Sequence, residues 1–176
     1  MKKQKIILGL GSNIGDRMEN LRSAISKLTN YLLVESISSI FESVALLPEG
    51  AVEDWNKPFY NMVLVVTSDM SPDEIISITK AIEEEMGRVK LGHWSPRNID
   101  IDILLFDELV IKQDDLRIPH KEMLKRDFVL LPMVEVAGDF KYPQEGKYKG
   151  MAIADIVKEK GFKLGDTIAK IGKLHD

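Results

Sequence analysis

The sequence predicts an α+β fold in which an antiparallel sheet is backed by helices. Four apolar, partly β-branched runs are typical of strands, at 5–10, 33–44, 59–67 and 99–106. Between them, apolar residues recur at helical spacing over about 16–31 and 71–87. The chain therefore runs strand, helix, strand, strand, helix, strand, which predicts a βαββαβ core.

The composition is that of an ordinary globular protein. Its 176 residues fit a single domain, with a core over about 5–143 and an extension over about 144–176. Apolar residues make up 44% and charged residues 30%, and the net charge of -4 gives no general attraction for nucleic acid or an anionic membrane. The absence of cysteine excludes disulfides and thiolate chemistry.

Nothing in the sequence points to export or membrane insertion. The apolar run at 6–10 is too short for a signal peptide, and no stretch approaches the length of a membrane-spanning helix. Three histidines, His93, His120 and His175, lie too far apart for a zinc cluster. We therefore expect a cytoplasmic protein that binds neither nucleic acid nor a membrane.

A glycine-rich turn at 11–16 connects the first strand to the first helix. Such a turn can hold phosphate on its backbone N–H groups. This one matches neither the phosphate-binding loop of nucleotide hydrolases nor the dinucleotide fingerprint, so a tight turn with a helix cap is favoured.

The long segment 46–58 suits no regular element and is expected to be a mobile loop, because loops of this length are commonly functional or disordered. The strand after it contains Asn61, although asparagine is disfavoured inside strands. Two explanations stay open. Neighbouring backbone satisfies the amide, or the amide presents its donor and acceptor to a bound heterocycle.

The second helix has a clear beginning and end. Ser71, a proline and Glu74 form a capping signal, and Gly87 closes the helix. Three glutamates at 83–85 crowd the last turn, where the helix dipole disfavours acids, so we expect one of them to have a partner other than solvent. A second irregular loop, rich in cations, follows at 88–96.

The most informative stretch is 94–107, Trp-Ser-Pro-Arg-Asn-Ile-Asp-Ile-Asp-Ile-Leu-Leu-Phe-Asp. Strand side chains alternate, so Asp100 and Asp102 share one face while the isoleucines around them face the core. Neighbouring carboxylates repel each other and need either an open solvated face or a divalent cation such as Mg²⁺. With Trp94 and Arg97 directly before them, a metal-assisted phosphate site is favoured.

Weaker patterns follow this strand. We expect a short edge strand at 108–111, a short helix at 121–126, a helix at 128–136 capped by Asp127, and two weakly amphipathic segments at 151–158 and 164–171.

In a ferredoxin-like arrangement, both irregular loops hang over one end of the sheet if the strands of Asn61 and Asp100 are central neighbours. Carboxylates holding Mg²⁺ among cations are suited to phosphoryl or nucleotidyl transfer. The candidate cations are Arg88, Lys90, Arg97, His120 and Arg126. The candidate flat apolar walls are Trp55, Phe59, Trp94 and Phe128.

Together these residues resemble the 6-hydroxymethyl-7,8-dihydropterin pyrophosphokinase (HPPK) family, whose members transfer pyrophosphate from ATP to a pterin alcohol in folate synthesis. The resemblance covers roughly residues 6–143 and rests above all on the run 94–106. The other signatures are 10–16, Phe59-Tyr60-Asn61, Gly87-Arg88, 118–120 and 126–130.

The resemblance implies two Mg²⁺ ions at Asp100 and Asp102, with attack of the pterin alcohol on the β-phosphorus of ATP and release of AMP. It implies catalytic roles for these two aspartates, Arg97 and Arg88. The ATP-binding residues it implies are Glu83, Lys90, Trp94, Arg97, His120 and Arg126. The pterin-binding residues it implies are Ser43, Leu46, Phe59, Asn61, Trp94 and Phe128.

The chain also departs from the family pattern. The second loop is one residue short, and His93 and Lys90 stand where the family often has arginine. Arg117 and Lys121 occupy positions where the family shows other residues, so no role is carried onto them. The resemblance further implies a folate-pathway enzyme as a possible neighbour, and we expect a monomer or weak dimer.

Two other classes of function fit parts of the pattern. A nucleotidyltransferase also pairs a Gly-Ser turn with two aspartates, but close together, whereas Gly11 and Asp100 are far apart here. A ferredoxin-like binding module for a metabolite or RNA needs no aspartate pair, and the acidic balance argues against RNA. Release of AMP distinguishes the kinase from the transferase, and dependence on Mg²⁺ distinguishes it from the module.

Overall fold

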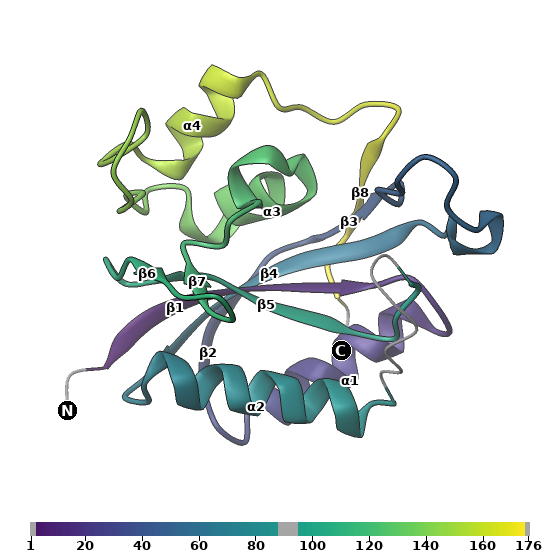
Figure 1. Cartoon of the computed structure of the whole chain (residues 1–176), viewed down its shortest axis with the longest axis horizontal. Coiled ribbons are helices and arrows are strands. Elements are labelled where there is room, and N and C mark those ends of the chain that lie inside the picture. Colours follow the sequence, from purple (N-terminus) through teal and green to yellow (C-terminus); the bar gives the residue numbers. More distant parts are fainter. Residues whose placement is uncertain (1–2, 88–94, 175–176) are drawn as a thin grey trace.

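The computed structural model describes residues 3–87 and 95–174. Its centre is a six-stranded antiparallel sheet with helices on both faces (Figure 1). The strands are β1 (Gln4–Ser12), β2 (Leu33–Ile37), β3 (Ile40–Ser43), β4 (Phe59–Ser68), β5 (Asp100–Phe106) and β8 (Ile168–Gly172). The helices are α1 (Arg17–Leu28), α2 (Pro72–Glu85), α3 (Asp127–Ala137) and α4 (Ile153–Lys160). None of the helices in these ranges is both long and apolar enough to cross a membrane.

The order of elements through β5 confirms the predicted α+β core. The sheet runs β5-β1-β4-β3-β8, and β2 also pairs with β4. Helices α1 and α2 cover one face, and α3 covers the other, with α4 packed on its outer side (Figure 1). A separate pair of short strands, β6 (Ile111–Lys112) and β7 (Arg117–Ile118), lies beside β5.

Alternation along the strands divides the core into two layers. Ile6, Leu8 and Leu10 of β1 join the cluster beneath α1 and α2, as do Ile101 and Ile103 of β5. The isoleucines of β5 therefore face the core as predicted, and the aspartates face the α3 side.

Both predicted helix beginnings are confirmed. Asp16 caps α1 by accepting the backbone N–H of Glu19, and α1 ends at Leu28, a little before the predicted end. Ser71 and Glu74 form a capping box at α2. Gly87 follows α2 with a φ of +82°, a backbone conformation that glycine adopts without strain.

Several predicted elements differ in the structure. The strand expected at 33–44 is two strands, because Ser38 interrupts the ladder: its hydroxyl accepts the N–H of Val63 and donates to the carbonyl of Ser39. The strand expected at 108–111 is wrong, since pairing involves residues 111–112 instead. The segment 121–126 contains only a 3₁₀ turn (Met123–Lys125).

Three further differences affect the ends of elements. Residues 11 and 12, expected in a turn, continue β1. Arg126 rather than Asp127 occupies the N-cap position of α3. The amphipathic segment at 164–171 contributes β8, which pairs antiparallel to β3. The loop expected at 46–58 contains one 3₁₀ turn (Glu53–Trp55).

Candidate active site

Two pockets meet at the aspartate pair of β5. The first lies on the α3 side of the sheet, and the second lies between α2, β5 and the segment 114–121. Among the residues that the structure describes, Asp100 and Asp102 alone line both pockets. Ligands in the two pockets would therefore face each other across these carboxylates.

The strands of Asn61 and Asp100 are not neighbours, because β1 lies between them. The condition that these strands be central neighbours is therefore not met, but the intervening strand is what brings the two side chains together. Gly11 pairs with Asn61 on one side and with Asp100 on the other, while Gly9 pairs with Asp102. Since glycine has no side chain, β1 forms an open floor across which β4 and β5 face each other.

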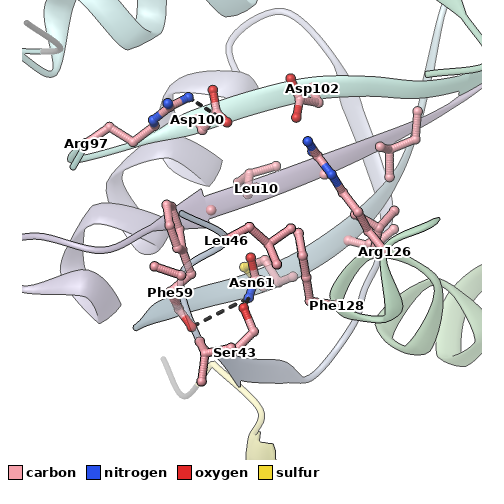
Figure 2. Close-up of a pocket in the computed structure, with 18 of the residues that line it drawn as sticks. Leu10, Ser43, Leu46, Phe59, Asn61, Arg97, Asp100, Asp102, Arg126 and Phe128 are labelled. Carbon is pink, nitrogen blue, oxygen red and sulfur yellow. Dashed lines mark hydrogen bonds and ion pairs between the residues drawn. The ribbon is translucent and has the colours of Figure 1, made fainter. Parts of the chain in front are cut away.

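The first pocket has flat apolar walls. Phe59 from β4 and Phe128 from α3 stand on opposite sides, with Leu46 between them (Figure 2). A Cβ on Gly11 would lie 3.5 Å from the Phe59 ring and 3.6 Å from Oδ1 of Asn61. The glycine therefore leaves room for a ligand on the floor beside both groups.

Asn61 is buried at the base of this pocket, and its amide is oriented by neighbours. Its Nδ2 donates to Oγ of Ser43 at 2.9 Å and to the carbonyl of Phe41 at 3.3 Å. These bonds leave Oδ1 directed toward Gly11 and the pocket. The structure thus combines the two explanations of Asn61, since backbone and serine hold the donor while the acceptor faces the cavity.

Asp100 is paired with the arginine that precedes its strand. Nη1 of Arg97 lies 3.2 Å from Oδ2 of Asp100. The Arg97 backbone is fixed in turn, because its N–H donates to Oδ1 of Asn13 at 2.8 Å and its carbonyl accepts the N–H of Asn13.

Asp102 is in an environment that disfavours its charge. Its pKa is raised from 3.8 to about 8, mainly by burial and next by the Asp100 carboxylate. Arg126 and Arg97 oppose this increase, and Figure 2 shows the Arg126 guanidinium directed toward Asp102. This environment disfavours the doubly ionised carboxylate pair and favours the arrival of further positive charge.

His120 faces the pair as a neutral imidazole. Its Nδ1 accepts the backbone N–H of Glu122, so the ring proton lies on Nε2, 3.8 Å from Oδ2 of Asp102. Burial and the nearby Arg126 lower the pKa of His120 to about 4. The side chain therefore presents a hydrogen-bond donor to the second pocket.

Two of the three glutamates at 83–85 have partners other than solvent, where the sequence predicted one: Glu85 is paired with Lys27 on the surface, and Glu83 lies inside the site. Its side chain is buried, and Oε1 accepts the N–H of Ile101 at 2.7 Å. Ile101 lies between the two aspartates on the outer strand of the sheet. Glu83 therefore replaces a missing strand neighbour at the point where the carboxylates are carried.

The structure brings together most of the predicted site residues. The first pocket collects Ser43, Leu46, Phe59, Asn61, Arg97, Arg126 and Phe128, and the second collects Glu83 and His120. Trp55 lines neither of these two pockets. Arg88, Lys90, His93 and Trp94 lie outside the described residues.

Other lining residues were not found from the sequence. In the second pocket these are Thr79, Lys80, Asp114, Asp115, Arg117 and Lys121. Lys80 and Glu83 are three positions apart on α2, a spacing that indicates a shared helix face. Thr79 lies on the same helix, and the others come from the bends, the two-residue strand β7 and the turn at 114–121, where no periodicity marks them.

The carboxylate pair fits a hard divalent cation such as Mg²⁺. Mg²⁺ is typically bound through one or two carboxylates, with water and substrate phosphates completing the shell. Within 3–87 and 95–174 no group of three or more His, Cys, Asp and Glu side chains is arranged to hold a metal by itself. The raised pKa of Asp102 agrees with a site made for a cation.

A model of the 7,8-dihydro-6-hydroxymethylpterin-pyrophosphokinase (HPPK) family matches residues 7–138. The 2-amino-4-hydroxy-6-hydroxymethyldihydropteridine pyrophosphokinase of Aquifex aeolicus is 40% identical over 138 residues, covering 78% of this chain and 83% of that protein. The protein of the same name from Bacillus subtilis is 37% identical over 131 residues, covering 73% and 75%.

Longer proteins contain a similar region. The folic acid synthesis protein FOL1 of Dictyostelium discoideum is 39% identical over 138 residues, which are 78% of this chain but 20% of that protein. The bifunctional protein FolKE of Lactococcus lactis is 39% identical over 142 residues, which are 39% of its length. This chain thus spans less than half of these two relatives.

Solved structures share the fold. The wild-type HPPK-DHPS of Plasmodium falciparum superposes with a TM-score of 0.68 at 18% identity, covering 90% of this chain and 45% of that one. At this identity the similarity shows the fold alone, and it includes the antiparallel sheet with its helices. Since the family model matches well over half of the sequence and a relative of similar length is 40% identical, this chain belongs to the HPPK family.

Proposed function

We propose that this protein transfers pyrophosphate from ATP to 6-hydroxymethyl-7,8-dihydropterin, giving AMP and the pterin pyrophosphate, a step of folate synthesis. The observation that carries the proposal is the meeting of two unlike pockets at Asp100 and Asp102. A flat apolar pocket suits a heterocycle, and a charged pocket suits a nucleotide. The acceptor and the donor would then meet where a cation can lie.

The pterin would occupy the first pocket, between Phe59 and Phe128. Aromatic rings on opposite walls of a pocket favour stacking of a flat ring system between them. Oδ1 of Asn61 would accept an N–H from the pterin edge, with Ser43 fixing the amide. Leu46 would close the side of the pocket, and Trp94 would join it from the second loop.

ATP would occupy the second pocket, with its phosphates directed toward the aspartates. His120 would donate from Nε2 to a phosphate oxygen, and Arg97 and Arg126 would add positive charge from the other side. The cations Lys80, Arg117 and Lys121 lie at this pocket beside the acids Asp114 and Asp115, and they would compensate part of the charge of an anionic ligand. Glu83, Arg88 and Lys90 are proposed to contribute to the same subsite.

Asp100 and Asp102 would hold two Mg²⁺ ions between the pockets. When bound, Mg²⁺ would neutralise charge on the transferred group and orient it. Arg97 keeps Asp100 in place, and Glu83 fixes the strand between the two carboxylates. The pterin oxygen forms a bond to the β-phosphorus, the bond to the α-phosphate oxygen breaks, and AMP leaves while the hydroxyl proton is released.

All the residues in this proposal belong to one chain, so a monomer suffices for the reaction. The relatives named FolKE and HPPK-DHPS carry a similar region within longer proteins. This supports a neighbouring enzyme of folate synthesis as a partner, placed so that the pterin product passes on.

Incubation with Mg²⁺, ATP and the reduced pterin alcohol tests the proposal, with nucleotides separated by chromatography. We expect AMP in an amount equal to the pterin consumed, and none above background without the pterin or with excess chelator. Release of free pyrophosphate with a nucleotidylated pterin would instead indicate a nucleotidyltransferase. Pterin binding without any turnover would indicate a binding module.

A further inference from the structure

The back of the first pocket is held by an arginine that does not line it. In the pairing of β3 with β4, Ser43 lies opposite Phe59, Phe41 opposite Asn61, and Glu42 opposite Tyr60. Phe59 and Asn61 line the pocket, whereas Tyr60 packs against the core beneath α1 and α2. Glu42 and Tyr60 are therefore the reverse side of the pocket wall.

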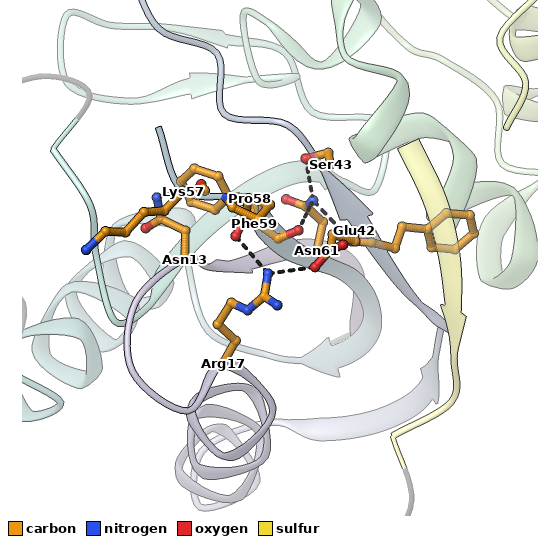
Figure 3. Close-up of polar contacts among 9 residues, drawn as sticks. Asn13, Arg17, Glu42, Ser43, Lys57, Pro58, Phe59 and Asn61 are labelled. Atoms are coloured by element: carbon orange, nitrogen blue, oxygen red, sulfur yellow. Dashed lines mark hydrogen bonds and ion pairs between the residues drawn. The ribbon is translucent and has the colours of Figure 1, made fainter. Parts of the chain in front are cut away.

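Arg17, the first residue of α1, contacts Tyr60, Glu42 and Pro58 on this reverse side, and Figure 3 shows its contacts with Glu42 and Pro58. Its guanidinium carbon lies 3.7 Å from the centre of the Tyr60 ring, a cation–π contact. Its Nη1 lies 2.8 Å from Oε2 of Glu42 and donates to the carbonyl of Pro58 at 2.9 Å. One side chain thus connects β3, β4 and the residue directly before Phe59.

A second side chain holds the preceding peptide. Nδ2 of Asn13 donates to the carbonyl of Lys57 at 3.2 Å, while its Oδ1 accepts the N–H of Arg97 (Figure 3). Two consecutive carbonyls before Phe59 are therefore fixed from the β1–α1 connection. By contrast, hydrogen bonds inside the long loop, such as Trp55 to Val52, are local and do not set its position on the sheet.

We infer that Arg17 is a positioning residue for binding in the first pocket: it fixes the end of the long loop and thereby the ring of Phe59. Asn13 also helps to fix the end of the long loop, but it contacts Arg97 as well, so its substitution would disturb both pockets. Arg17 touches the pocket from behind through Pro58, Glu42 and Tyr60. Substitution of Arg17 would leave the side chains of Phe59 and Asn61 unchanged, but their positions relative to Phe128 would no longer be fixed.

The inference rests on the proposed function only for its kinetic readout. Arg17→Met removes the charge and both hydrogen bonds, while Arg17→Lys keeps one ammonium that can reach the same two oxygens. We expect Arg17→Met to raise the KM for the pterin alcohol on the order of tenfold, since small misplacements of substrate-positioning groups are costly. The KM for ATP should change less than about twofold, and Arg17→Lys should fall between Arg17→Met and the unmodified chain.

The matched control is Arg22→Met, which removes an arginine of the same helix that pairs with Glu19. Because Arg22 lines neither of the two pockets, this change should leave both KM values unchanged. Glu42→Gln should raise the pterin KM in the same direction as Arg17→Met but by less, because its amide oxygen still accepts. If the Arg17→Met protein does not fold, the inference is tested by the pterin KM of the Arg17→Lys and Glu42→Gln proteins.

A role in stability alone predicts a different result. Thermal unfolding would then show a lower midpoint for Arg17→Met, while both KM values stayed at those of the unmodified chain, and this outcome would overturn the inference. Equal increases in both KM values would also overturn it. Direct titration with the fluorescent pterin alcohol, which needs no turnover, keeps failure of the inference distinguishable from failure of the proposed reaction.

Discussion

The two aspartates of β5 are the residues on which both sequence and structure concentrate the chemistry. They lie on one strand face, between a guanidinium and a neutral imidazole, and the pKa of Asp102 is raised to about 8. Without a bound cation, ionisation of both carboxylates is energetically unfavourable at this site. The arrangement therefore favours binding of a cation at the two carboxylates.

A pH dependence of stability follows for the metal-free protein. Between about pH 4 and pH 8 the folded state keeps a proton on Asp102 that the unfolded state has lost, so stability falls as pH rises through this range. Asp102→Asn should abolish turnover and yet raise the unfolding midpoint at pH 8 in chelator by a few degrees, since about 1 kcal/mol shifts the Tm of a domain of this size by about 2–4 °C.

Thermal unfolding in excess chelator from pH 5 to pH 9 checks this prediction. The exposed Asp139 offers the control Asp139→Asn, which should leave the pH profile unchanged. An Asp102→Asn protein that is less stable than the unmodified chain at pH 8 would contradict it. Addition of Mg²⁺ should stabilise the unmodified chain and not the variant.

At the residue scale, the sequence identified side chains with a regular pattern and missed those without one. The alternation of isoleucine and aspartate indicated which face carries the carboxylates, because a period of two is a property of the strand itself. Gly9 and Gly11 were missed because their contribution is the absence of a side chain. Their function became visible only from the register, which places them between Asn61 and the aspartates.

At the scale of elements, the tail supports the first pocket from a distance. β8 pairs with β3, and Thr167 accepts the N–H of Val44, which lines that pocket. On the other side, Glu135 of α3 connects Lys170 to the N–H of Ser39. The beginning of the segment 44–47, which leads to Leu46, is thus tied to the chain directly before β8.

Removal of residues 164–176 should therefore weaken pterin binding more than ATP binding. We expect a several-fold higher KM for the pterin alcohol and a lower unfolding midpoint, because the edge of β3 loses its neighbour. Steady-state kinetics with each substrate varied in turn measure the effect. Lys170→Met, which removes only the contact with Glu135, provides a milder comparison, and identical kinetics for the truncated and full chains would contradict the role of β8.

Local pattern could not predict β8. The sequence of 164–171 shows a short amphipathic segment, and its state as a strand depends on an open edge of β3 that is distant in the chain. The same limit explains the second pocket, whose lining residues at 114–121 come from turns. Periodicity reports what an element is, whereas its neighbours depend on the whole fold.

At the scale of the whole molecule, β5 separates two sites that adjoin at the carboxylates. Substitutions deep in one pocket should therefore affect one substrate at a time. Gly11→Val places a branched side chain against Phe59 and Asn61, and it should raise the pterin KM at least tenfold with little change for ATP. Arg117→Glu reverses a charge at the second pocket. It should raise the KM for ATP with little change in the KM for the pterin alcohol, since a charge-assisted hydrogen bond contributes about 1.5–3 kcal/mol.

Both variants can be compared by the same kinetic assay and by circular dichroism, which reports whether the fold is intact. The expected result is a crossed pattern, with each variant impaired for one substrate. Equal impairment for both substrates in either variant would show that the two pockets are not separate sites.

The glycine floor of β1 has a consequence for inhibitors of this protein. A compound that rests on Gly9 and Gly11 contacts main-chain atoms, which a change of residue does not remove. Resistance by substitution at the floor itself would require an added side chain, which at Gly9 would crowd Leu104 and at Gly11 would lie against Phe59 and Asn61 and obstruct the substrate as well. Escape would then have to come from the walls, so compounds that rely on the floor more than on Leu46 or Phe128 should be the most durable.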